Sequence, residues 1–278
     1  MRKINKQIQP RPISTRYSLQ PYTINDIRPL DFYEFHSSVR VHILLTYEWL
    51  RVCPHYARLC KQDQLTFLRK SVLYHTILDP CFITLQVGDL SKFVLQNGGF
   101  ISTITDDGWQ DEHEISRDNK KKRVINFDLL NDLAVFQIYW PLLKRFMSDI
   151  IAQMVALNLD FEEFVAIKAL ISIQMTLFDA SKAGRSILKE ASDEICQALY
   201  KHCQVGNDLD KAIRLGNMLL LLSPIFDTAT NFVESHHEVQ FFDLWQLDSL
   251  LLQFLKNKGE KVREELMEEN HFLQRGED

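Results

Sequence analysis

Apolar residues recur every three to four positions along most of the chain, which is the pattern of amphipathic helices. The first such stretch runs from about Asp31 to Val52, and Pro54 follows its end. Asp31 and Glu34 have the spacing of a capping box, which favours a helix start there. The positions that share the predicted buried face are Val39, Ile43, Tyr47 and Leu50.

A second helical stretch begins near Asp63. Its predicted buried face consists of Leu65, Leu68, Val72 and Leu73. Proline lacks the backbone N–H that a helix interior requires, so this helix is expected to break near Asp79 and Pro80.

Residues 86–125 have a different character. Asn97-Gly98-Gly99 and Asp106-Asp107-Gly108 are turn signals, and the residues between them are rich in β-branched side chains. The pattern predicts a small β-hairpin, followed by a charged loop from Arg117 to Arg123.

Helical periodicity resumes after this loop. The remaining helices are predicted at about 129–146 with a bend at Pro141, from the capping-box pair Asp160 and Glu163 to Phe178, at 186–203, from about 208 through a bend at Pro224, and at 247–255. The run Leu219–Leu222 is apolar on every side, which predicts a central position.

Composition supports a helical class. Hydrophobic residues make up 46% of 278 residues, while glycine (9) and proline (8) are scarce. Residues 1–30 hold four prolines and six basic residues, which predicts a flexible basic arm or hinge. We therefore expect one all-α domain over 31–257 with a small β-hairpin insertion, and a polar acidic tail over 258–278.

Charge and cysteine content limit the classes of function that are plausible. A net charge of −5 argues against a nucleic-acid surface along the whole chain. The five widely spaced cysteines predict reduced thiols in an intracellular protein. No apolar stretch reaches membrane-spanning length, so we expect no membrane contact.

One segment goes beyond these patterns, because it resembles the signature of nuclear receptor ligand-binding domains. In that family a helix ends at a proline, an aromatic and a leucine follow, and an Asp-Gln pair opens the next helix. The matching residues are Pro54, Tyr56, Leu59, Asp63, Gln64, Leu65 and Leu68. Residues 159–170 and Arg214-Leu215-Gly216 also look like family segments, and the expanded nematode-type branch is most similar.

The resemblance implies a three-layer antiparallel helical sandwich without the zinc-finger DNA-binding domain, since the first cysteine is Cys53. It implies no enzyme, no cofactor, no metal and no catalytic residue. It further implies a protein of the nucleus, with the cytoplasm left open as a second location. Such a protein would bind a lipophilic small molecule, recruit coregulator peptides and form homo- or heterodimers, with no direct DNA binding by this chain.

The resemblance also implies two sites. A coregulator groove would pair the cation Arg51 with a C-terminal switch helix in which Gln253 stands where the family has glutamate. The groove residues are Arg51, Gln64, Leu68, Arg69, Leu250, Leu251, Gln253 and Phe254. A ligand pocket would be lined by Phe35, Val39, His42, Ile43, Val72, Leu73, Thr76 and Ile77, with His42 and Thr76 as the polar groups that orient the ligand.

Several alternatives stay open. The pocket positions could simply pack a closed core, and the chain could be a ligand-independent adaptor that titrates receptors or coregulators. Asp106, Asp107, Asp111 and Glu112 could suggest a helical isoprenoid-processing enzyme, but Gly108 interrupts them and no second metal motif accompanies them. Residues 120–123 are a nuclear-import patch or, by preference, a solvated loop. His236-His237-Glu238 could suggest a metal site, but adjacent helical residues point about 100° apart and do not easily share an ion, so surface histidines are expected there.

Overall fold

The computed structural model describes residues 23–30, 32–103, 137–203, 206–244 and 248–255, and the side chains at 32–38 and 255 are not part of that description. Several predictions fall outside these ranges. They include the capping box at Asp31, the aspartates of 106–112, the charged residues 117–123, the helix start near Leu129, and the tail.

Helices dominate the described residues, as predicted. In chain order the elements are η1 (Ile24–Asp26), β1 (Arg28–Pro29), α1 (Phe32–Arg51), α2 (Pro54–Arg58), α3 (Lys61–Val87), β2 (Lys92–Val94), β3 (Gly99–Ser102), a helix over 137–145 that continues into the π-helical turn η2 (Phe146–Ile151), α6 (Ala152–Leu157), α7 (Phe161–Leu177), α8 (Lys182–His202), α9 (Asp208–Leu220), α10 (Leu222–Phe241) and α11 (Ser249–Leu255).

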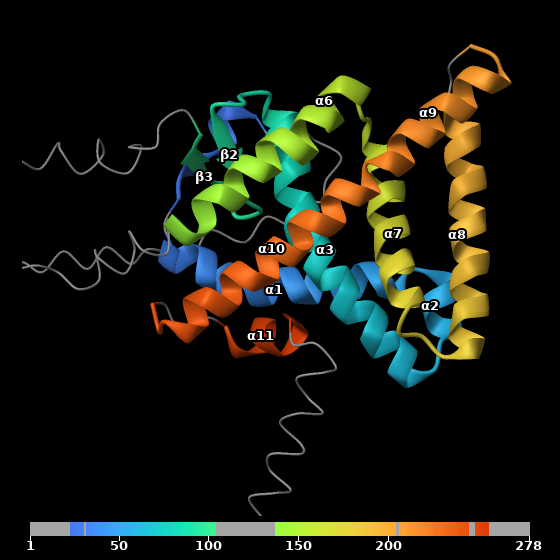
Figure 1. The fold of residues 1–278 in the computed structure, drawn as a ribbon, viewed down its shortest axis with the longest axis horizontal. Coiled ribbons are helices and arrows are strands. Elements are labelled where there is room, and N and C mark those ends of the chain that lie inside the picture. Colours follow the sequence, from blue (N-terminus) through green and yellow to red (C-terminus); the bar gives the residue numbers. More distant parts are fainter. Residues whose placement is uncertain (1–22, 31, 104–136, 204–205, 245–247, 256–278) are drawn as a thin grey trace, which may run out of the picture.

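The helices form a three-layer sandwich around α3 (Figure 1). α3 packs along α7 in the middle, α1 covers one side, and η2 and α10 cover the other. Fully buried apolar side chains fill the space between these layers, namely Ile77, Leu78, Ile150, Ile167, Ile171 and Ile225. The predicted all-α class is therefore confirmed. Among the described residues, no helix has both the length and the apolar character needed to cross a bilayer.

The small sheet confirms the predicted hairpin and adds a strand. β2 and β3 are antiparallel, and Gly98 adopts the positive φ of 78° that their tight turn requires. β1 pairs with β3 in parallel, with Arg28 opposite Gly99. Arg28 and Pro29 were expected in a flexible arm, so that expectation is wrong for these two residues.

α3 does not break at Pro80, contrary to prediction. The helix continues to Val87 with Pro80 buried inside it. Proline leaves the carbonyl four residues earlier, on Thr76, without its helical donor. The Gln96 side-chain amide, beside the hairpin, donates to that carbonyl at 3.3 Å. A hydrogen bond from outside the helix thus compensates for the proline.

Other helix boundaries and faces also differ from expectation. One long helix was predicted from residue 208, but it divides at Leu221 into α9 and α10. Leu221 is fully buried, whereas Leu220 is 70% exposed, so the leucine run is not central on all sides. The predicted buried faces include Tyr47 and Leu65, yet both are exposed.

The capping box at the start of α7 is confirmed. The Asp160 carboxylate accepts from the Glu163 amide at 2.8 Å, and the Glu163 carboxylate accepts from the Asp160 amide at 3.2 Å. α8 begins earlier than expected, because Ser181 caps it and the Asp63 carboxylate binds the Ser181 amide and hydroxyl. Asp63 of the signature segment therefore fixes the junction between α7 and α8.

Candidate functional site

α11, the last helix in the part of the chain that the structure describes, lies against α1 and α3 (Figure 1). Its anchor in the core is Leu251, which is buried. Asp248, just before the helix, accepts from the amides of Leu250 (2.9 Å) and Leu251 (3.3 Å) through Oδ1. Its other oxygen, Oδ2, accepts from Nε of Arg40 on α1 at 2.6 Å. α11 is therefore held to the body of the domain by an apolar side chain and a carboxylate.

The second half of α1 exposes apolar and charged side chains in one stripe. Leu44, Tyr47, Glu48 and Arg51 follow helical spacing and are all exposed. Arg51 donates to both oxygens of Glu48, at 3.0 and 3.1 Å, and lies 5.8 Å from the centre of the Tyr47 ring. At the start of α3, Leu65 is also exposed. A cation at the C-terminal end of α1 thus accompanies exposed apolar side chains.

The other predicted groove residues lie nearby but are more enclosed. Gln64 Nε2 donates to the Tyr56 carbonyl at 3.0 Å, which ties α2 to α3. Leu68 is half-buried and packs against the cluster that contains Leu50 and Tyr56. Arg69 is half-buried. On α11, Gln253 is exposed, while Leu250 and Phe254 are half-buried.

The predicted pocket residues line the interface of α1 and α3. His42, Ile43, Val72 and Ile77 are buried, and Val39, Leu73 and Thr76 are half-buried. Val39 and Leu73 pack against the main core. The Thr76 hydroxyl donates to the Val72 carbonyl at 2.8 Å, so it is already used within α3. The Phe35 side chain lies outside the description.

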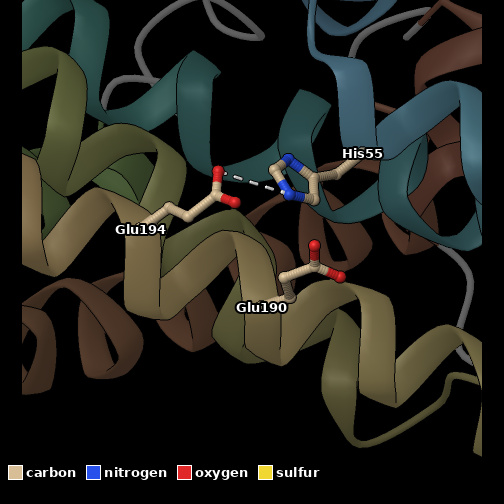
Figure 2. A group of neighbouring side chains, drawn as sticks. All are labelled: His55, Glu190 and Glu194. Carbon is tan, nitrogen blue, oxygen red and sulfur yellow. Dashed lines mark ion pairs between the residues drawn. The ribbon is translucent and has the colours of Figure 1, made fainter.

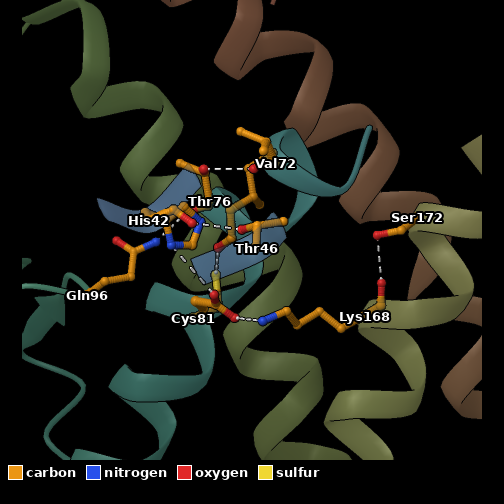
Figure 3. A network of polar contacts seen from close by, with 10 residues as sticks. His42, Thr46, Val72, Thr76, Cys81, Gln96, Lys168 and Ser172 are labelled. Atoms are coloured by element: carbon orange, nitrogen blue, oxygen red, sulfur yellow. Dashed lines mark hydrogen bonds and ion pairs between the residues drawn. The ribbon is translucent and has the colours of Figure 1, made fainter. Parts of the chain in front are cut away.

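His42 belongs to a buried polar cluster at the meeting of α1, α3 and α7 (Figure 3). Its Nδ1 is 4.0 Å from Oδ2 of Asp79, and the ammonium of Lys168 on α7 binds Oδ1 of Asp79 at 2.5 Å. The pKa of His42 is lowered to about 4, mainly by burial; the charge of Asp79 opposes this shift and that of Lys168 contributes to it. His42 is therefore neutral at pH 7 and lies beside a buried ion pair.

Sequence reasoning missed His236 on α10. It was expected on the surface, but it is 4% exposed, which corrects that expectation. Its Nδ1 is 2.8 Å from the Phe232 carbonyl, and its ring meets the rings of Tyr139 (5.2 Å) and Phe232 (4.1 Å). Burial lowers its pKa to about 4. The clue lay in the spacing, because His236 falls on the buried stripe with Ile225, Ala229, Phe232 and Val239.

The protonation of His236 follows from its surroundings. A neutral imidazole that faces a carbonyl through Nδ1 carries its proton there, so Nε2 is left as an acceptor. No hydrogen bond reaches Nε2 or the Tyr139 hydroxyl from the residues that the structure describes. Tyr139 is half-buried, and the imidazole nitrogens that are fully buried without a hydrogen-bond partner in the described chain are instead Nε2 of His42 and Nε2 of His75.

Two clusters of histidine and acidic residues could suggest metal sites. In one, His55 on α2 faces Glu190 and Glu194 on α8 (Figure 2), with ligand atoms within 4.8 Å of one another. However, Arg58 donates to both oxygens of Glu190, at 3.0 and 2.7 Å. The second cluster, Asp160, Glu162 and His202, holds a 2.8 Å contact between His202 and the capping carboxylate. Ion pairs between helices account for both.

α9 carries an exposed apolar stripe. Leu209, Ile213 and Leu220 are exposed, and with the exposed Gly216 their spacing of four, three and four residues places them on one face. Arg214, on another face, binds both oxygens of the buried Glu163 at 2.6 Å and so fixes α9 to α7.

Comparisons with known proteins agree with this arrangement. Residues 20–242 match the family model described as ligand-binding domain of nuclear hormone receptor. The chain is 38% identical over 237 residues to the nuclear hormone receptor family member nhr-80 of Caenorhabditis elegans, which covers 84% of this chain and 44% of that protein. It is 25% identical to nhr-22 and 24% identical to nhr-20 of the same organism, covering 84% and 83% of this chain and 39% and 49% of those proteins. The chain thus spans less than half the length of these relatives.

Proposed function

This chain belongs to the nuclear hormone receptor family through its ligand-binding domain, and on that premise we propose that it binds an apolar small molecule and recruits coregulator helices. Members of the family are ligand-regulated transcription factors rather than enzymes. A nuclear location, a dimer partner and control of transcription by this chain belong to the same proposal.

The observation that carries the proposal is the position of α11 beside α1 and α3, together with the exposed stripe on the second half of α1. A partner helix with an apolar face needs apolar contacts along its length and a cation at its carbonyl end. Leu44, Tyr47 and Leu65 supply exposed apolar surface, and Arg51 supplies the cation. On α11, the exposed Gln253 offers a neutral acceptor for the amide end, which is weaker than a carboxylate by about 1 kcal/mol.

The interior supports the ligand-binding half of the proposal. The half-buried apolar residues Val39, Leu73, Tyr139, Phe226 and Val233 come from α1, α3, the 137–145 helix and α10, and all pack against the main core. An apolar enclosure with few polar groups is what a lipophilic ligand requires. The acceptor nitrogen of His236 and the Tyr139 hydroxyl are the polar groups we assign to orienting that ligand, beside the predicted His42 and Thr76.

The groove is tested by replacing Arg51 with glutamate. A labelled amphipathic peptide, with leucines three and four residues apart, is titrated and followed by fluorescence polarisation. The reversed charge repels the carbonyl end of the peptide helix, so we expect affinity to fall at least tenfold, about 1.4 kcal/mol. Arg145→Glu is the matched control, because Arg145 is a partly exposed member of an ion pair on another helix.

Unchanged peptide affinity in a folded Arg51→Glu protein would remove the groove from the proposal. The adaptor alternative is separated from the ligand sensor by native mass spectrometry. A co-purifying lipid supports the sensor, and a dimer without any bound small molecule supports the adaptor. The exposed stripe of α9 is the feature that favours dimer formation.

A further inference from the structure

The Asp248 side chain both caps the first turn of α11 and binds α1. Its Oδ1 caps the first amides of α11, and its Oδ2 accepts from Arg40 on α1, 208 positions earlier in the chain. We propose that Arg40 and Asp248 form a latch that sets the docked position of α11. Arg40 is then a positioning residue for the coregulator groove, a role that rests on the proposed function.

The latch is asymmetric in its exposure. The Asp248 side chain is 6% exposed, whereas that of Arg40 is 64% exposed. Burial opposes ionisation of Asp248, but the hydrogen bonds from Arg40 and from the two amides outweigh it and keep its pKa below the usual value. A buried carboxylate is tolerable only while its partners are in place. Without Arg40, the docked position of α11 becomes unfavourable for Asp248.

Little else holds α11. A helix of seven residues is too short to be stable alone in water, so its order depends on docking. Its fully described contacts with the body are the buried Leu251 and half-buried apolar neighbours. The latch therefore adds to the docking that Leu251 and these neighbours provide. Because the Arg40 side chain is already exposed to water, release of α11 does not leave a buried cation without a partner.

Because one carboxylate makes both contacts, the latch determines where α11 docks as well as how tightly it docks. The cap geometry places Asp248 at the first turn of α11, and Arg40 is one fixed point on α1. A one-residue shift of the segment would move the carboxylate away from Arg40 or from the amides. The start of α11, and hence the outward position of Gln253, is set by this one junction.

The test is hydrogen exchange of the α11 amides in the full 278-residue chain. Arg40→Gln removes the ion pair and leaves the cap, and Asp248→Asn does the same from the other side, since asparagine is also a good cap. We expect each change to speed α11 exchange about threefold to tenfold, a range set by the exposure of Arg40. The double variant should exchange no faster than either single variant, because both act through the same contact.

Arg58→Gln is the matched control, because Arg58 also pairs with a carboxylate on a distant segment and is about half exposed. It should leave α11 exchange unchanged. Unchanged exchange in Arg40→Gln, or additive effects in the double variant, would overturn the latch.

Peptide binding to the same proteins separates the two proposals. If the wild-type chain binds the peptide, Arg40→Gln should weaken it by about the same factor as it speeds exchange. Full affinity in an Arg40→Gln protein with released α11 would overturn the positioning role. If the wild-type chain binds no peptide, the proposed function fails, while the exchange result still decides whether the latch exists.

Discussion

At the scale of single residues, the described side chains include four buried imidazoles, those of His42, His55, His75 and His236. His42, His75 and His236 are each less than a tenth exposed, and burial is the main reason that the pKa of each lies below its ordinary value. Each ring is therefore neutral in the folded domain at pH 7. Packing, rather than charge, determines their role there.

These imidazoles predict how stability depends on pH. Their folded pKa values are depressed below about 6.5, so the unfolded chain binds protons first as pH falls, and stability is lost from about pH 6.5 toward pH 4. Three such groups should cost about 4–5 kcal/mol between pH 6.5 and 5. Urea unfolding at a series of pH values measures this, and His42→Gln should reduce the slope by about one third.

His202 contributes to the pH dependence of stability with the opposite sign. Its hydrogen bond with Asp160 raises its pKa, so its contribution is present at low pH and is lost as pH rises through the raised value. Both side chains are more than a third exposed, so that contribution is small. A pH-independent free energy of unfolding from pH 7 to 5 would contradict the assignment of neutral buried imidazoles.

The buried positions of His42 and His236 differ in how far the sequence predicted them. His42 was placed at the pocket by the resemblance, and it is buried. His236 was expected on the surface, although it shares the buried helical spacing of Ile225, Phe232 and Val239. What sequence could not supply was the partner of His42, since Asp79 and Lys168 are brought together by the packing of α3 and α7.

At the scale of elements, junctions proved harder to predict than helices. The stop at Pro54 and the cap at Asp160 followed from local chemistry, and both are present. The continuation of α3 through Pro80 depends on Gln96, and the early start of α8 depends on Asp63. Those partners are 16 and 118 residues away, so no local pattern contains them.

The junction between α3 and α8 gives a prediction for Gly184. A Cβ built there would lie 2.3 Å from Oδ2 of Asp63, a buried carboxylate that holds the Ser181 hydroxyl and amide. Gly184→Ala should push Asp63 away from those donors and cost about 1–3 kcal/mol of unfolding free energy. Thermal and urea unfolding measure the loss.

Gly216 is the matched control. It lies in α9, and a methyl group added to its Cα would meet no atom within 4 Å, so alanine there should stabilise the helix by about 0.8–1 kcal/mol. Equal effects of the two substitutions would show that Asp63 moves freely and that the junction is not fixed as described.

At the scale of the whole molecule, the fold class was readable from periodicity, and the layer order followed from the resemblance. The sheet was readable only in part. The turn chemistry at Gly98 indicated the hairpin, but the pairing of Arg28 with Gly99 joins segments 71 residues apart, in a region whose prolines favoured an arm. Which exposed apolar surfaces serve partners was not readable either, since Leu220 was expected inside.

The stripe of α9 predicts self-association. Leu209, Ile213 and Leu220 are exposed on one face, and burying them against a second copy or a related receptor would remove that apolar area from water. Ile213→Glu should weaken dimers at least tenfold in sedimentation velocity, because a charge would be buried without a partner. Phe178→Glu, at another exposed apolar position, should leave the dimer intact. A wild-type chain that stays monomeric at high concentration would contradict the assignment.

Pro80, inside α3, has a consequence for which substitutions the sequence can accept. Pro80 is tolerated because Gln96 supplies the donor that Thr76 would otherwise lack. A lineage that lost Gln96 alone would keep a bare carbonyl, and one that lost Pro80 alone would leave the amide of Gln96 competing with an ordinary helical bond. Substitutions at these two sites are therefore expected to be inherited together.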